Sequence, residues 1–382
     1  MGPLTGIKVV EFAGLGPVPF CCMLLSDMGA EVIRIDRMTD SSDQTDGDAR
    51  SYVLGRNRRS IAVDLKSKEG RELVKRLICG ADVLVEGFRP GVMERLGLGP
   101  VDCDDINPRL IYGRMTGWGQ DGPLSSTAGH DINFISLSGL LHCIGYKDSA
   151  PVPPLNLIGD FGGGALYLAF GIVCALVERS SSGKGQIIDA AMIDGVSSLM
   201  ASLFSAIARG DWKNARGSNL LDGGAPWYGV YETKDGKYVS IGSVEERFYR
   251  ELLERLGLDQ QSLPSRDDRS GWAVLRKALA DVFITKTRAE WCSILEGTDA
   301  CFSPVLDPWE APGHQHLAAR DIFVDYEGVV QPRPAPRFSR TAPGIKRHPP
   351  VPGEHSRHIL TELGYSEAEV EALIAAGVVE QR

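Results

Sequence analysis

The chain has 382 residues, of which 43% are hydrophobic and 24% are charged, as is typical of a globular protein. A single hydrophobic core stops growing at about 250–300 residues, so more than one domain is expected. The formal net charge of −9 excludes a protein that binds nucleic acid over its whole surface, because such binding requires the opposite sign. An anionic ligand must therefore meet a local basic patch.

The first predicted elements form a βαβ unit. The β-branched run Ile7 to Phe12 is typical of a buried strand, and Gly14 and Gly16 then indicate a turn. Pro19 opens an apolar helix, since proline is tolerated in a first helical turn. The run Glu31 to Ile35 is the next predicted strand.

The same alternation continues to about residue 210. Strands that alternate with helices predict an α/β fold with a parallel, doubly wound sheet. Further strands are expected at 60–65, 81–86, 109–115 and 186–189, and helices at 68–79, 162–179 and 192–209.

The sequence texture changes after residue 210. Residues 230–241 predict a hairpin with an Asp-Gly turn, and three helical segments follow it. We therefore expect a large Rossmann-like domain and a smaller α+β domain. The expected boundaries are 1–210 for the large domain, completed by 340–382, then 225–330 for the small domain, with 211–224 and 331–352 as crossing linkers.

The termini and the cysteines favour a cytoplasmic protein, with peroxisome and mitochondrion left open. The beginning of the chain lacks the features of a signal peptide, and no apolar run suggests a membrane-spanning helix. The end, Val378 to Arg382, is not a peroxisomal signal. The eight cysteines contain no C-x-x-C pair, which argues for reduced thiols rather than a metal site.

The first turn resembles part of a dinucleotide-binding fingerprint. Gly14 and Gly16 follow a strand, but Pro19 occupies the place of the third glycine, which argues against NAD(P). The cluster Arg56–Arg59 is a candidate phosphate site, because arginine forks suit phosphates, with a solvated loop as the alternative. Arg37 follows the second strand, where a nucleotide contact is expected.

Two titratable residues stand beside glycines. His130 alone is more often structural than catalytic, and Asp160 before a glycine run could be an N-cap. If a helix begins there, Gly162 and Gly163 would offer free N–H groups to an oxyanion. Apolar neighbours would raise the pKa of Asp160 and make it a better base.

Eight collinear segments span almost the whole chain. They are VVEFAGLGPVPFCCMLLSDMGAEVIRIDR, RLIYGRMTGWGQDGP, AGHDINFISLSG, PVPPLNLIGDFGGG, SSGKGQIIDAAMIDG, RGSNLLDGGAPWY, GTDACFSPVL and RPAPRFSRT. Together they closely resemble the α-methylacyl-CoA racemases, within the family III CoA-transferase superfamily. Such a set is far more specific than any single motif.

The resemblance implies an interlocked homodimer in which each chain crosses between its large and small domains. It places two opposed acid/base groups at His130 and Asp160. The glutamate that orients the histidine across the dimer corresponds to Glu245. Neither a metal nor a cofactor is implied, because CoA is part of the substrate. The implied CoA contacts are Arg37, Val63, Asp64, Leu65, Lys66, Gly129, Asp131, Ile132, Asn133 and Phe134.

The sequence departs from close relatives in two places. Residues 39–50 form a longer loop, which leaves the detail of the CoA side open. Glu246 replaces the usual neighbour of the glutamate at Glu245.

The resemblance implies interconversion of (2R)- and (2S)-2-methylacyl-CoA through an enolate. One alternative is a family III CoA transferase in which Asp160 is the nucleophile. Another is a catalytically silent CoA-binding or dimerisation protein, against which the intact His130, Asp160 and Glu245 argue. The sequence leaves the acyl chain open, because fatty acyl, bile-acid and arylpropionyl thioesters place the same carbon between the same bases.

Overall fold

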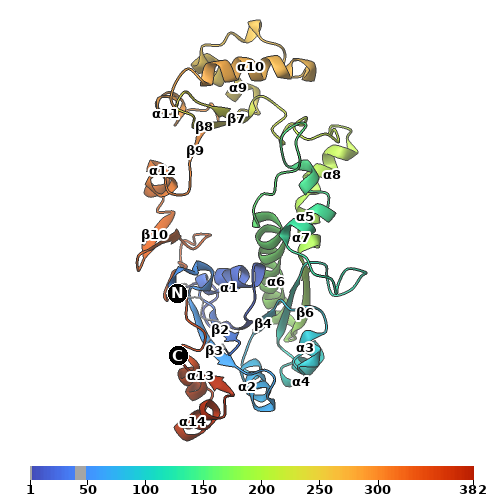
Figure 1. Cartoon of the computed structure of the whole chain (residues 1–382), viewed down its shortest axis with the longest axis vertical. Helices are drawn as coiled ribbons and strands as arrows, with labels where there is room; N and C mark the ends of the chain where they lie inside the picture. The colour runs from blue at the N-terminus through green and yellow to red at the C-terminus, as the bar shows by residue number, and fades with distance from the viewer. Residues whose placement is uncertain (1, 39–48) are drawn as a thin grey trace. The chain divides into compact units, whose positions relative to one another are not determined.

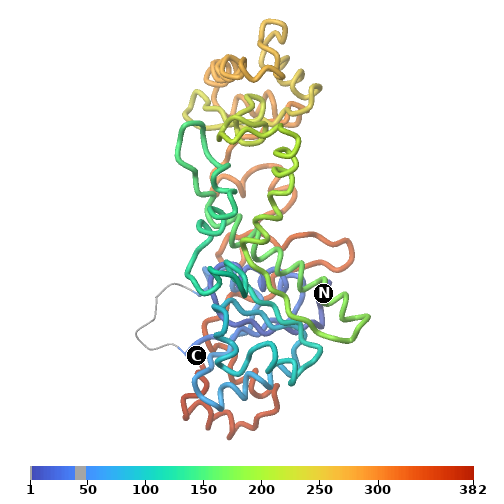
Figure 2. Tube along the Cα trace, turned by 90° about the vertical axis from the view of Figure 1, so that its right-hand side faces the viewer, coloured from blue at the N-terminus to red at the C-terminus, as the bar shows by residue number. Residues whose placement is uncertain are grey.

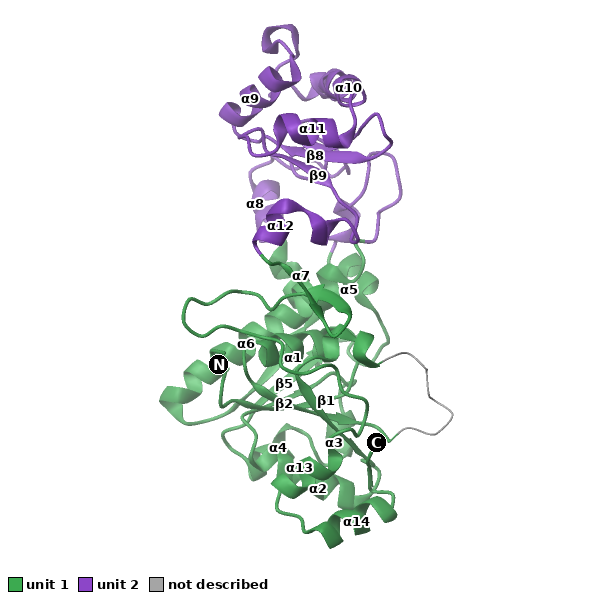
Figure 3. Cartoon of the chain, turned by 90° about the vertical axis from the view of Figure 1, so that its left-hand side faces the viewer, with its two compact units in different colours: residues 1–138, 154–200, 321–382 green, residues 139–153, 201–320 purple. Residues whose placement is uncertain are grey.

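The structure is a computed structural model that describes residues 2–38 and 49–382, so the longer loop predicted at 39–50 lies largely outside the described residues. The chain divides into two compact units (Figure 3). Unit 1 comprises residues 1–138, 154–200 and 321–382, and unit 2 comprises residues 139–153 and 201–320. Unit 1 contains two hydrophobic cores and unit 2 contains one, and no sheet is shared between the units.

Unit 1 is built on a seven-stranded sheet with the order β12-β3-β2-β1-β4-β5-β6 (Figure 1). Neighbouring strands are parallel, except that β12 pairs antiparallel with β3. The strand order reverses between β1 and β4, as in doubly wound folds, so the predicted fold class is confirmed. The strands are β1 Lys8–Phe12, β2 Glu31–Asp36, β3 Arg58–Val63, β4 Val83–Glu86, β5 Ile111–Thr116, β6 Gln186–Ala191 and β12 Val379–Glu380.

The two faces of this sheet carry separate cores. Val9 enters one core and Val10 the other, because successive side chains of a strand point to opposite faces. The Val10 core includes residues of α2, α4, α13 and α14, and the Val9 core includes residues of α1 and α6. The helices of unit 1 are α1 Pro17–Asp27, α2 Lys68–Cys79, α3 Val92–Arg95, α4 Pro100–Ile106, α5 Asp131–Leu137, the π-helix η4 Leu157–Ala165, α6 Leu166–Ser182, α7 Met192–Leu199, α13 Ser356–Glu362 and α14 Glu367–Ala375.

The C-terminal segment returns to the first strands. Helix α13 packs against β3, and β12 adds a strand beside it, with Val379 opposite Val63 (Figure 2). The hairpin of β10 Phe323–Tyr326 and β11 Val329–Pro332 precedes this segment. Residues far apart in the sequence therefore complete one core.

Unit 2 contains a three-stranded antiparallel sheet and helices around a single core. The predicted hairpin is confirmed: β7 and β8 pair, and Gly236 in the turn has a positive φ of 69°. The strands are β7 Tyr228–Glu232, β8 Tyr238–Gly242 and β9 Phe302–Val305. The helices are α8 Ala201–Ala208, α9 Glu246–Leu256, α10 Trp272–Phe283, α11 Arg288–Leu295 and α12 Gln315–Ala319. Short 3₁₀ turns in the two units are η1 Ala49–Ser51, η2 Val53–Gly55, η3 Leu141–Cys143, η5 Gln260–Ser262, η6 Arg269–Gly271 and η7 Ala311–Gly313.

The division differs from the expected boundaries at residues 139–153 and 201–210, which belong to unit 2, and at 321–330, which belong to unit 1. Arg216 holds the first of these segments, because its guanidinium donates to the backbone oxygens of His142 at 2.7 Å and Ser149 at 2.6 Å. Such long-range bonds leave no trace in the local sequence pattern.

One continuous helical stretch among the described residues, Leu157–Ser182, is long and apolar enough to cross a membrane by length and composition alone. A core helix passes the same test, and here Leu168 and Ile172 are fully buried in the core that α6 shares with the sheet. The absence of a membrane segment therefore stays a prediction.

Candidate active site

A pocket of about 320 Å³ opens at the carboxyl ends of β1, β4 and β5, where the strand order of the large sheet reverses. Ligands of doubly wound folds bind at this kind of position. The wall is formed by residues 15–18, 87–90 and 115–118, by Ser125, residues 127–130 and Phe134, and by Asp160 and Met192. All of these residues belong to unit 1.

His130 is exposed on this pocket at the N-cap of α5. Its backbone N–H donates to the Asn133 side chain at 3.0 Å, and the Asn133 N–H donates back to the His130 oxygen at 2.8 Å. Behind it, the rings of Trp118 and Phe134 meet edge to face with centroids 4.7 Å apart. The backbone of His130 is therefore fixed, while its imidazole faces the pocket.

Asp160 lies on the same pocket and is half-buried in the π-helix η4. Its carboxylate accepts a hydrogen bond from the Asn156 amide at 3.1 Å. Burial raises the pKa of Asp160 above its usual range, and the negative charge of Asp131 raises it further, while Asn156 and His130 act in the opposite direction. A raised pKa makes this carboxyl better suited to exchange protons near neutral pH.

The turn at Gly16 is shaped by this carboxylate. Gly16 has a positive φ of 64°, and a Cβ placed on it would lie only 2.8 Å from the Asp160 Oδ2 atom. The fingerprint-like glycine of the first turn is thus required by the close approach of Asp160.

The Asp131 carboxylate holds the backbone of Asp160, a contact that was not predicted from the sequence. This carboxylate, on a residue that is 6% exposed, accepts the backbone N–H of Asp160 at 2.8 Å. Its second oxygen is buried without a hydrogen-bond partner among the described residues. The CoA contact expected at Asp131 stays a prediction, and its carboxylate in addition supports the backbone of Asp160.

The helix that carries Asp160 begins at Leu157, five residues before the predicted start. Gly162 and Gly163 therefore lie inside the helix, where each N–H of a π-helix donates to the carbonyl five residues earlier. A Cβ on Gly163 would lie 2.7 Å from the Val196 nitrogen, so its small size serves packing against α7. The backbone N–H groups that have no partner within the helix therefore belong to the residues just before Asp160 and not to Gly162 or Gly163.

The predicted CoA contacts lie at two neighbouring places. Arg37 and Lys66 are exposed just beyond the carboxyl ends of β2 and β3, which pair directly. Asp64 and Leu65, which follow β3, are half-buried, whereas the Val63 side chain is buried in the core. In the second group Gly129 lines the pocket, Ile132 and Asn133 are exposed, and Phe134 is buried.

Glu245 is the exposed N-cap residue of α9 and belongs to unit 2, so it is not part of the pocket that His130 and Asp160 line. Its neighbour Glu246 pairs with Arg266 at 3.3 Å and with the Gln260 amide at 2.9 Å. The unusual residue beside Glu245 thus has a structural partner.

The arginine cluster predicted as a phosphate site is structural, which corrects that prediction. Arg56 pairs with Asp27 at 2.6 Å, and Arg58 pairs with Glu11 at 2.9 Å with both side chains fully buried. Arg59 pairs with Glu31 and Glu362. Each charge is neutralised by a carboxylate from a distant segment, which the local sequence cannot reveal.

A further buried ion pair, Arg114 with Glu86, holds the rim of the pocket and was not predicted from the sequence. Glu86 accepts the Phe88 N–H at 2.7 Å and the Arg114 Nε at 3.0 Å. Phe88 and its neighbours Gly87 and Arg89 line the pocket. The only sequence signal was a glutamate at the end of a predicted buried strand.

The chain belongs to CoA-transferase family III, whose model matches residues 4–356. It is 48% identical to the alpha-methylacyl-CoA racemase of Mus musculus, over 99% of this chain and 97% of the relative. It is 30% identical to the succinyl-CoA:glutarate CoA-transferase of Homo sapiens, over 99% and 90% of the two chains. The crystal structure of a CAIB/BAIF family protein from Brucella suis matches with a TM-score of 0.82, 28% identity and coverage of 95% and 99%. The family resemblance predicted from the sequence is confirmed.

Proposed function

We propose that the protein is an isomerase that interconverts (2R)- and (2S)-2-methylacyl-CoA thioesters. The observation that supports this proposal most directly is that His130 and Asp160 line one pocket at the sheet edge, with the pKa of Asp160 raised by burial. The high identity to a racemase over nearly the whole chain supports the same activity.

The proposed reaction uses one base on each face of the α-carbon. One base takes the α-proton, the electron pair of the C–H bond forms a C=C bond to the carbonyl carbon, and the π pair of the C=O bond moves onto the thioester oxygen to give an enolate. The other group, protonated beforehand, returns a proton to the opposite face. By resemblance, His130 acts on the (2S) face and Asp160 on the (2R) face, and each contributes about 10²–10⁴-fold to the rate.

The enolate oxygen requires a hydrogen-bond donor in the pocket. The first N–H groups of a helix have no partner within it, so the residues at the start of η4 are the candidates. The Asp160 N–H is already bound to Asp131, which leaves the N–H groups before it. We propose no metal and no cofactor, since two bases and such donors suffice for this proton transfer.

The CoA end of the substrate is proposed to bind along the carboxyl edge of the sheet. Arg37 and Lys66 supply positive charge there, beyond β2 and β3. The phosphates of CoA would meet these side chains, while the thioester lies between His130 and Asp160.

We propose that the working form is a homodimer. Leu166, Phe170, Val173 and Val177 repeat at spacings of four, three and four residues along α6, and all are exposed, Phe170 by 69% and Val177 by 66%. The other side of α6 is buried in the core of unit 1. Such a contiguous apolar stripe fits an interface with a second copy, from which Glu245 could orient His130.

The second candidate is a CoA transferase, favoured by the 30% identity to a transferase. There the Asp160 carboxylate would attack the thioester carbonyl, form an acyl-enzyme anhydride and release the CoA thiolate. His130 would have no role as a base in that reaction.

One experiment separates the two. Pure (2R)-2-methylacyl-CoA is incubated with the protein in D2O without any acceptor acid. The deuterium content of the α-carbon and the ratio of the two epimers are followed over time. Racemisation predicts deuterium at the α-carbon and drift toward an equal mixture. Transfer of CoA to an added carboxylic acid without exchange would establish the transferase instead. Asp160→Asn should abolish most of the deuterium entry from the (2R) epimer, and His130→Ala should abolish most of the drift toward an equal mixture, because the opposite face then lacks its proton donor.

A further inference from the structure

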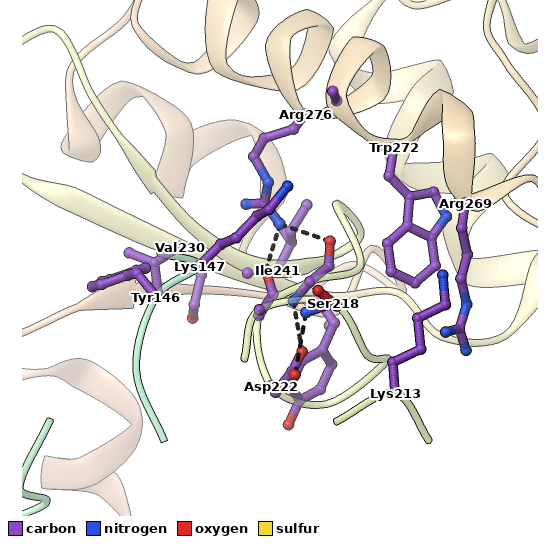
Figure 4. A pocket seen from close by; sticks show the side chains of 18 of the residues that line it. Tyr146, Lys147, Lys213, Ser218, Asp222, Val230, Ile241, Arg269, Trp272 and Arg276 are labelled. Carbon is purple, nitrogen blue, oxygen red and sulfur yellow. Dashed lines mark hydrogen bonds between the residues drawn. The ribbon is translucent and has the colours of Figure 1, made fainter. Parts of the chain in front are cut away.

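Unit 2 contains a large pocket that the proposed racemisation does not use. Its volume is about 1020 Å³, at the upper end of the roughly 300–1,000 Å³ typical of small-molecule sites. Its walls come from residues 146–147, the loop 213–224, strands β7 and β8, and the beginning of α10 (Figure 4).

Long-range hydrogen bonds hold these walls together. Arg216 ties the segment around residue 147 to the loop, and the Arg276 guanidinium of α10 donates to the backbone oxygens of Gly223 and Gly224. Inside the loop, the Asp222 carboxylate accepts N–H groups from Ser218, Asn219 and Gly224 at 2.8–3.2 Å. The pocket is therefore formed in advance of any ligand.

The charge of this pocket is opposite to that of the whole protein. Lys147, Lys213, Arg269 and Arg276 all line it, and Asp222 is the single carboxylate among the described lining residues. The oxygens of Asp222 are already occupied by the loop N–H groups. Four cations thus face one cavity in a chain with a net charge of −9, which favours a ligand with several negative charges.

Aromatic rings accompany these cations. In the view of Figure 4, the ring of Trp272 lies between Arg276 and Arg269, and the Arg269 guanidinium lies 5.4 Å from the centroid of that ring. Tyr146 and Tyr228 also line the pocket. Exposed aromatic faces bind planar rings by stacking, and neighbouring lysines and arginines bind phosphates.

We propose that this pocket binds a nucleoside phosphate, with the phosphates at the lysines and the base against the aromatic rings. The ligand is either a free adenine nucleotide or the adenine nucleotide end of a CoA molecule, because both present the same phosphorylated adenosine. The inference goes beyond the racemase activity and does not depend on it, since every residue that carries it belongs to unit 2.

Calorimetric titration with ADP tests the proposal on the full-length protein. The variant Lys147→Ala/Lys213→Ala removes two cations whose ammonium groups make no hydrogen bond or ion pair with the described residues, so its unfolding temperature should stay unchanged. We expect its affinity for ADP to fall by about tenfold or more, because bonds between charged groups are lost. The control Lys234→Ala/Lys277→Ala changes the charge of unit 2 equally without touching the pocket and should keep the affinity of the parent.

Arg37→Ala separates this site from the proposed CoA site of unit 1. ADP binding that survives Arg37→Ala and is lost in Lys147→Ala/Lys213→Ala supports the proposal, whatever happens to racemisation. Binding lost only in Arg37→Ala, or equal in all variants, overturns it. A parallel titration with CoA identifies the source: competition between CoA and ADP in the Arg37→Ala protein indicates the nucleotide end of CoA, and binding of ADP alone indicates a free nucleotide.

Discussion

Two buried carboxylates of unit 1 act in different ways on the residues around them. Asp131 accepts the backbone N–H of Asp160 and also places a negative charge close to its carboxyl group. Glu11 neutralises the fully buried Arg58. The first bears on the chemistry of the pocket and the second on stability, so their substitution should have separable effects.

Asp131→Asn should change the pH dependence of catalysis. The asparagine oxygen can still accept the Asp160 N–H, but the negative charge that raises the pKa of Asp160 is lost. Asp160 must be deprotonated to act as the base on the (2R) epimer. The acidic limb of kcat/KM for that epimer should therefore move to lower pH. The exposed Asp121→Asn is the control and should leave the limb in place, and an unmoved limb in Asp131→Asn would contradict the electrostatic role.

Glu11→Gln should destabilise the protein strongly. It leaves the Arg58 guanidinium buried without its compensating charge, which costs about 3–5 kcal/mol of the free energy of unfolding. Glu31→Gln is the matched control, because Glu31 is exposed and Arg59 keeps Glu362 as a partner, so its loss should stay below about 1 kcal/mol. Urea unfolding measures both, and similar losses would show that burial of the Glu11 pair matters little.

At the scale of elements, the close approach of η4 and α7 sets the position of Asp160. A Cβ on Gly195 of α7 would lie 1.9 Å from the Gly163 oxygen, so these helices can meet only through glycine. Gly195→Ala should push η4 away, lower stability by about 1–3 kcal/mol and reduce turnover with it. Ser198→Ala, an exposed position on the same helix, should alter neither. Urea unfolding and the deuterium exchange rate give the two readings.

The same elements show what the sequence could predict. The runs at β1 and β2 are short and β-branched, and this local pattern sufficed to predict the parallel sheet, as the Asp-Gly turn sufficed to predict the hairpin at Gly236. The predicted start of the helix at residue 162 was wrong. A glycine run is typical of a helix start, but here the glycines allow close contact between η4 and α7. Arg58 was misjudged because its partner Glu11 is 47 residues away. His130 and Asp160, both predicted from the sequence, line the pocket in the structure. The support from Asp131 could not be predicted, because it depends on tertiary packing.

At the scale of the whole molecule, the exposed stripe on α6 makes self-association testable. Phe170→Glu puts a charge in the middle of the stripe, and burying a charge without a partner in an interface is costly. Light scattering after gel filtration should show twice the mass of one chain for the parent and a single-chain mass for Phe170→Glu. Val101→Glu is the control, since Val101 is 77% exposed on α4, which packs on the other face of the sheet.

The dimer prediction also has a catalytic consequence. If Glu245 of a second copy orients His130, the monomeric Phe170→Glu variant should fold normally by circular dichroism but lose most deuterium exchange of the (2S) epimer, on which His130 is the base. Glu245→Gln should then lose exchange to a similar degree while remaining a dimer, because it removes the carboxylate without disturbing the stripe. A Phe170→Glu protein that is monomeric and fully active would mean that unit 1 performs the proton transfer alone, with His130 and Asp160 as a complete site.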